Sequence, residues 1–146
     1  MSQTLFSGPL ASGDKQAGVA GGPNIGLAVL SQSVLIDFDA TLVQNATMYL
    51  PLGSRIVNIV ADVLTQYNSA TSATLTVGTA SAGTTYASGV NAKTAARTTP
   101  TFTAAQLTAM GSTALAPVVT TITSVGQPTA GQVRVTVMYV QTTSQD

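Results

Sequence analysis

Apolar and polar residues alternate along most of the chain beyond residue 30, with the period of two that is typical of β-strands. The segment from Gln132 to Thr142 is the clearest case. One of its faces carries Val133, Val135, Val137 and Tyr139, and the other carries Arg134, Thr136, Met138 and Val140. Shorter segments of the same kind are 34–39, 47–50, 55–66, 72–78 and 115–124. Six or more short strands separated by turn residues predict an all-β fold, an antiparallel β-sandwich.

A jelly roll is the preferred topology for this sandwich, and an immunoglobulin-like arrangement stays open. In the segment 34–39, Val34, Ile36 and Phe38 are expected on one face, and Asp37 and Asp39 on the other, solvent-facing one.

The segment 55–66 has apolar residues on both of its faces. One face would hold Val57, Ile59, Ala61 and Val63, and the other Ile56, Asn58, Val60, Asp62 and Leu64. This pattern predicts a central strand packed on both sides, with Ile59 in the core.

Two stretches depart from the alternation. Residues 79–98 are mostly small, so the pattern predicts a long irregular excursion there. Thr103 to Gly111 has an N-capping Thr, good helix formers and a closing Gly, which indicates two helical turns.

The first 30 residues show neither period and contain six Gly and two Pro, so we interpret residues 1–30 as an extended N-terminal arm and residues 31–146 as the sandwich domain. A linker of Gly and Ser alone would not need apolar residues. The arm nevertheless carries the candidate partner-contact residues Leu5, Phe6, Leu10, Val19, Ile25 and Leu27. The arm is thus expected to order against a neighbouring subunit, and a disordered tail is the alternative.

The small number of charged residues indicates that this domain is one subunit of a larger assembly. Only 5 basic and 5 acidic residues occur among 146, whereas an ordinary domain draws about a quarter of its residues from these types. Charged residues keep copies of a soluble protein apart and are depleted at the centres of interfaces. The composition therefore indicates a surface that other copies or partners cover.

The same charges argue against two classes of partner. The five basic residues are dispersed in the sequence and the formal net charge is zero. The sequence therefore shows no basic cluster that would attract the phosphates of a nucleic acid, and nucleic acid is not expected as a partner. The most apolar stretch, 56–64, is far shorter than the roughly 20 residues that span a bilayer. The first 15 residues lack the pattern of a secretory signal, and no membrane partner is expected.

The chain has few of the residue types that act in catalysis or bind metals. It contains no His, Cys or Glu, so we expect no catalytic residue, no cofactor and no metal. Ser12 and Lys15 match the S-x-x-K spacing of serine acyl-enzymes, and Lys93-Thr94-Ala95 comes close to their K-T-G, but Ser12 lies in the Gly-rich arm and the match is ascribed to chance. Asp37 and Asp39 could form half of a calcium site, although two acids on one strand face are usually just the solvent side.

One set of segments resembles a known family. It comprises Leu75-Thr76-Val77-Gly78-Thr79-Ala80, then Tyr86 to Asn91 with Ala96-Arg97, and the closing strand Val133 to Val140. Together they resemble head decoration or cement proteins of tailed bacteriophages, over about residues 33–141. Relatives carry acidic residues after the Gly-Thr-Ala turn, where this chain has Ser81-Ala82-Gly83.

The resemblance implies a non-enzymatic jelly-roll subunit, commonly a homotrimer, made in the host cytoplasm and placed on the outer surface of the capsid. Its partners would be the major capsid protein, whose neighbouring subunits it bridges, and other copies of itself. A receptor- or glycan-binding sandwich domain of a phage fibre or spike is the alternative. Such a domain would need a concave polar site, and the absence of Trp leaves no evident aromatic platform for it.

Overall fold

The computed structural model describes residues 11–12, 26–112 and 116–141. It contains ten strands and one short helix in the following order. These are β1 (Ala11–Ser12), β2 (Gly26–Leu27), β3 (Leu30–Asp37), β4 (Val43–Tyr49), β5 (Ser54–Thr65), β6 (Ser72–Gly78), β7 (Ala87–Asn91), β8 (Arg97–Thr98), α1 (Ala104–Met110), β9 (Pro117–Val125) and β10 (Gln132–Gln141).

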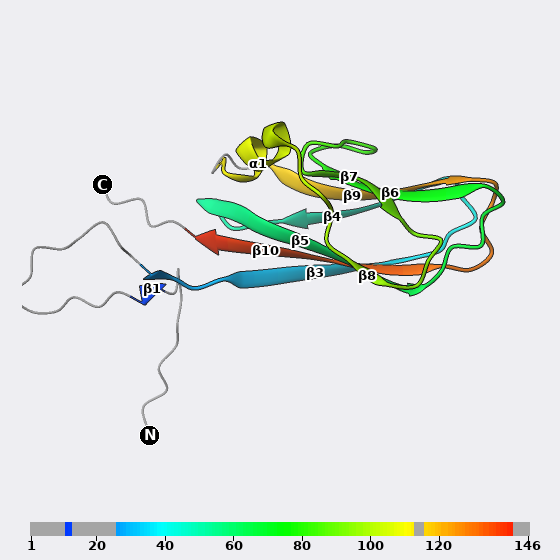
Figure 1. Cartoon of the computed structure of the whole chain (residues 1–146), viewed down its shortest axis with the longest axis horizontal. Helices are drawn as coiled ribbons and strands as arrows, with labels where there is room; N and C mark the ends of the chain where they lie inside the picture. Colours follow the sequence, from blue (N-terminus) through cyan, green and yellow to red (C-terminus); the bar gives the residue numbers. More distant parts are fainter. Residues whose placement is uncertain (1–10, 13–25, 113–115, 142–146) are drawn as a thin grey trace, which may run out of the picture.

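Two four-stranded antiparallel sheets pack face to face, as the two layers of ribbons in Figure 1 show. One sheet has the order β3-β10-β5-β8 and the other β4-β9-β6-β7. The pairs are nested, because the first long strand pairs with the last, β4 with β9, β5 with β8 and β6 with β7. A long hairpin rolled up in this way is a jelly roll. The predicted all-β sandwich is confirmed, and the strand order is the jelly-roll one.

The core lies between the sheets and follows the predicted alternation. Val133, Val135 and Val137 of β10 are fully buried, as is Ile59 of β5, which is paired with Val137. Phe38, by contrast, is exposed, because β3 ends one residue earlier and the chain turns away toward β4.

A β-bulge in β5 corrects the predicted faces of this strand. The register with β10 shifts between Met138 and Tyr139, so that Ile56 faces the core and Val57 is exposed. A bulge inserts one extra residue and thereby reverses the alternation on one side of it. The prediction that β5 is packed on both sides is also wrong for this chain, since Leu64 on the outer face is about half exposed.

The stretch 79–98 is less irregular than expected, since it contains β7 and the two-residue β8. Its small residues leave few apolar side chains to show a period of two, which is why the alternation missed both strands. The predicted helix is confirmed as α1. Thr103 caps it, its hydroxyl accepting the backbone N–H of Gln106 while the Gln106 side chain accepts that of Thr103.

Most of the predicted arm lies outside the described residues, including Leu5, Phe6, Leu10, Val19 and Ile25. Of Leu27 only the backbone is described, in β2, which pairs with β1 through Leu27 and Ala11. The structure therefore does not test the arm contacts.

Candidate interaction surface

Two long edge strands lie on the same side of the sandwich. β3 ends one sheet and β4 ends the other, and they are adjacent in space. An open groove of about 400 Å³ runs between them, lined by Leu35–Asp37 of β3, by Asp39 and Thr41 of the connection, and by Val43–Ala46 of β4. On the opposite side the edge strands are shorter: β7 has five residues and β8 has two, and next to β8 the Val63 N–H of β5 donates to the Ala96 carbonyl at 2.9 Å. In the described part of the chain, the two longest edge strands are therefore those of the β3–β4 side.

The register of β3 with β10 determines which of its backbone N–H and C=O groups point to the free edge. Phe38 N–H donates to the Gly131 carbonyl at 2.9 Å, so Phe38 and Gly131 form a hydrogen-bonded pair. In an antiparallel ladder such pairs alternate with pairs whose N–H and C=O groups point away from the partner. The backbone groups of Ser31, Ser33, Leu35 and Asp37 therefore point away from β10, toward the free edge.

β4 also has a row of backbone groups that point away from its partner strand. Ser124 N–H donates to the Leu42 carbonyl at 2.7 Å, which places the backbone groups of alternate residues on the free edge. These residues are Val43, Asn45, Thr47 and Tyr49. Among their carbonyls, that of Val43 accepts the Thr41 hydroxyl at 3.1 Å. Two parallel rows of backbone donors and acceptors thus face outward beside each other.

The polar side chains of the groove are engaged within the chain. Gln44 donates through Nε2 to the Asp39 carbonyl at 2.8 Å and accepts the Tyr67 hydroxyl through Oε1 at 2.8 Å. Asn45 Oδ1 accepts the Thr121 hydroxyl at 2.7 Å, and Asp37 accepts Gln132 Nε2 at 2.6 Å. These bonds hold the two sides of the groove in place, and they leave the second oxygen of Asp37 and the amide nitrogen of Asn45 for other contacts beside the strand edges.

Tyr67 anchors this end of the sandwich. Its side chain is fully buried, and burial raises the pKa of its hydroxyl to about 12, with the carboxylate of Asp37 adding to the shift. The hydroxyl therefore stays protonated and remains a donor to Gln44 at any physiological pH.

Asp37 and Asp39 are both exposed, as the alternation predicted. Within the described ranges no three Asp, Glu, His or Cys side chains come together as metal ligands would. The described groove residues thus give no support to a calcium site at Asp37 and Asp39.

A row of three charged side chains crosses the outer face of the sheet β3-β10-β5-β8. Asp62 of β5 lies between Arg134 of β10 and Arg97 of β8, with Oδ1 accepting Arg97 Nε at 2.6 Å and Oδ2 accepting Arg134 Nη2 at 2.8 Å. Hydrogen bonds from Arg97 and then from Arg134 lower the pKa of Asp62 to about 2. Sequence spacing missed this row, because its three residues come from three different strands. Both salt bridges in the described part of the chain converge on Asp62.

The row gives the fold an acid-sensitive element. The folded pKa of Asp62, about 2, lies below the ordinary value of 3.8, so its stabilisation is present above about pH 4 and is lost as the pH falls through about 2. We expect the difference in melting temperature between the wild type and Asp62→Asn to shrink across that window. Thermal unfolding of both proteins at about pH 5 and about pH 2 measures it. Equal differences at the two pH values would show that the row does not stabilise the fold.

Lys93 has a structural role in the folded chain. Its Nζ donates to the Ser69 carbonyl at 2.7 Å and lies 3.4 Å from the carbonyl oxygens of Ala70 and Thr71. The ammonium thus closes the β5–β6 connection by bonding to three successive carbonyls. The side chains of Ser12 and Lys15, the residues of the S-x-x-K match, lie outside the described part of the chain.

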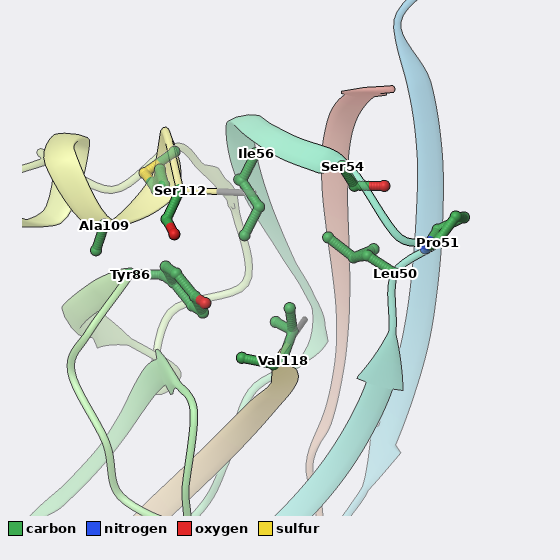
Figure 2. A pocket seen from close by; sticks show the side chains of 10 residues that line it. Leu50, Pro51, Ser54, Ile56, Tyr86, Ala109, Ser112 and Val118 are labelled. Carbon is green, nitrogen blue, oxygen red and sulfur yellow. The ribbon is translucent and has the colours of Figure 1, made fainter. Parts of the chain in front are cut away.

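A small cavity lies at the α1 end of the sandwich, away from the open groove. Figure 2 shows Ile56, Tyr86 and Val118 around one space, below the end of α1. Its volume of about 20 Å³ is close to the minimum that holds one water molecule. Ser54 also lines it, and its buried hydroxyl has no hydrogen-bond partner among the described residues. The cavity has room for a water molecule but none for a substrate.

The exterior carries many large apolar side chains for its few charges. Those that are between 44% and 76% exposed are Val29, Leu35, Phe38, Leu42, Val43, Tyr49, Leu52, Val57, Leu64, Leu107 and Val125. Leu35 to Val43 surround the β3–β4 connection, and Tyr49 and Leu52 surround the next one. Four of these apolar side chains thus lie near the two free strand edges, whereas Val57, Leu64, Leu107 and Val125 belong to β5, α1 and β9.

No family model, curated protein or solved structure matches the chain. In the described residues, no helix has the length and apolar character needed to cross a membrane.

Proposed function

We propose that the chain is a non-enzymatic virion protein, a capsid decoration or cement protein that binds the outer surface of a tailed-phage head. The observation that carries the proposal is the exterior of the jelly roll: among the described residues both salt bridges lie in the single row at Asp62, while apolar side chains and two strand edges are open. Such an exterior favours burial against protein partners over free solution. The resemblance in segments 75–80, 86–91 and 133–140 gives the partner its identity, the major capsid protein.

The mechanism is linkage between binding and shell stability. A subunit that binds the assembled shell more tightly than its dissociated parts stabilises the shell by the difference in binding free energy. Bridging neighbouring capsid subunits adds buried interface that internal pressure from packaged DNA must break. The arm residues Leu5, Phe6, Leu10, Val19, Ile25 and Leu27 are proposed as additional anchors on capsid or sister subunits. A homotrimeric state belongs to the proposal through the resemblance alone.

Attachment to heads is expected to depend weakly on salt. Exposed ion pairs contribute little to a charge-poor interface, and screening therefore has little to remove. Co-sedimentation of the purified protein with expanded, undecorated heads at low and at moderate salt measures the affinity. We expect a change of less than about threefold, whereas an interface held by many ion pairs would lose far more.

A collapse of binding between the two salt concentrations would contradict the charge-poor interface. Failure to bind heads at any salt, together with saccharide binding on a glycan array, would instead support the receptor-binding alternative. Within the groove the amide of Gln44 is bonded inside the chain through both its nitrogen and its oxygen, which leaves that side chain little capacity to bind a sugar.

A further inference from the structure

We propose that two copies of this chain join edge to edge, with β3 of one copy pairing antiparallel with β3 of the other about a two-fold axis. The occupant of the open edge is thus a second copy of the protein. This pairing concerns copies of the chain alone and does not depend on the proposed attachment to a phage head.

The first observation is the row of outward backbone groups. Four residues of β3, namely Ser31, Ser33, Leu35 and Asp37, direct both N–H and C=O toward the free edge. Eight backbone groups in one straight row form a template for another strand.

The second observation is that, within the residues that the structure describes, the edge lacks the usual protection against pairing. Natural edge strands are blunted by Lys, Pro, bulges or a short length. β3 is eight residues long, contains neither Lys nor Pro, and pairs with β10 without a register shift. Its only charged residue is Asp37, at the very end.

The third observation is a register that uses the whole edge. Pairing Ser33 with Leu35 of the second copy, and Ser31 with its Asp37, matches all four outward residues at once. The two Asp37 carboxylates then lie about 20 Å apart along the strands. That separation exceeds the Debye length of about 8 Å, so the only charges on the two strands do not repel.

The fourth observation is that one axis serves both sheets. The register above centres the two-fold axis on Val34. Matching all four outward residues of β4 in the same way centres its pairing on Ala46. Val34 and Ala46 are each partly buried against the core, and they are equally far in sequence from Ala40 at the middle of the β3–β4 connection. The two centres therefore belong to the same level of the sandwich, and a single axis can extend both sheets into the second copy.

The test uses the absence of native Cys in the chain. Ser33→Cys and Leu35→Cys are prepared separately and mixed under mild oxidation. Directly opposite, hydrogen-bonded residues have Cα atoms about 5.5 Å apart, within the range of a disulfide. We expect a disulfide-linked dimer in the mixture and little in either variant alone, because identical residues lie diagonally in this register. Thr136→Cys, on the same face but on the inner strand β10, is the matched control and should not cross-link with Leu35→Cys.

A second variant tests the edge without Cys. Ser33→Pro removes an N–H that points to the free edge and leaves the backbone hydrogen bonds to β10 in place; of the contacts with β10 it removes the side-chain bond between the hydroxyls of Ser33 and Thr136. We expect it to keep the β-rich circular dichroism spectrum and to shift the dimer dissociation constant at least tenfold upward in sedimentation equilibrium.

Several outcomes would overturn the pairing. They are no cross-link in the mixture, cross-linking by either single variant alone, or equal cross-linking by the Thr136→Cys control. A trimer that binds heads but gives no bond between positions 33 and 35 would also overturn it, while leaving the proposed function intact. If Ser33→Pro does not fold, the cysteine pair still decides the question.

Discussion

Replacing Ile59 by Ala is expected to lower the free energy of unfolding by about 2–5 kcal/mol. Ile59 is fully buried in the middle of β5, where the two sheets face each other, and it is paired in register with Val137, which is also fully buried. The substitution removes three carbon atoms from a site whose neighbours are held by two sheets. The space left behind can collapse only in part, so a cavity cost adds to the lost burial.

A denaturant titration of Ile59→Ala measures this loss, and Val57→Ala in the same strand is its control. Val57 lies two residues away at the bulge and is 46% exposed, so its truncation should cost less than about 0.5 kcal/mol. A cost for Ile59→Ala as small as that expected for Val57→Ala would mean that the face of β5 is assigned wrongly.

Replacing Gly131 by Ala is the second large effect. Gly131 has a φ of 156°, and a Cβ there would lie 2.5 Å from Cδ2 of the buried Tyr67 ring. Backbone strain of about 1–3 kcal/mol and a steric overlap of similar size would act together, for a total of about 2–6 kcal/mol. The ring cannot retreat without cost, because its hydroxyl is hydrogen-bonded to Gln44.

Gly89→Ala separates these two causes. Gly89 has a positive φ of 75°, but a Cβ there would meet no atom within 4 Å. This variant should show only the backbone cost of about 1–2 kcal/mol. Thermal or denaturant unfolding of both variants gives the comparison. Equal losses would show that the contact with Tyr67 does not constrain the turn before β10.

The sequence predicted those features of the fold that depend on local alternation. The faces of β10 and the burial of Ile59 follow from a period of two, and α1 follows from its cap and closing Gly. The faces at the start of β5 did not follow, because a bulge depends on the partner strand and leaves no mark in the spacing of Ile56 and Val57. β7 and β8 were missed because small residues show no contrast between faces.

The interaction surface was less visible in the sequence than the core. The row at Asp62 joins residues from β5, β8 and β10 and becomes apparent only once the sheet order is known. The hydrogen bond from the Lys93 ammonium to the Ser69 carbonyl joins a side chain to backbone more than twenty residues away in the sequence. The free edge of β3 also depends on topology, since the same alternating segment would be a protected strand in the middle of a sheet. The low charge, by contrast, could be read directly and pointed to an exterior that partners cover.

The fold explains how the sandwich is stabilised with so few charged residues. Hydrogen bonds between uncharged groups hold the loops together: Asn68 accepts the backbone N–H groups of Thr129 and Ala130, and Gln127 donates to the Ala40 carbonyl at 2.6 Å. Such contacts stabilise a sandwich without giving its surface a repulsive field. The surface therefore does little to prevent association, as the proposed function requires.

The central claim is that this charge-poor exterior is made to be covered by other protein surfaces. Sedimentation equilibrium of the purified, full-length protein from micromolar to millimolar concentration tests it most directly. The account predicts reversible association into a defined oligomer that persists at moderate salt. A protein that stays monomeric over the whole range would contradict it.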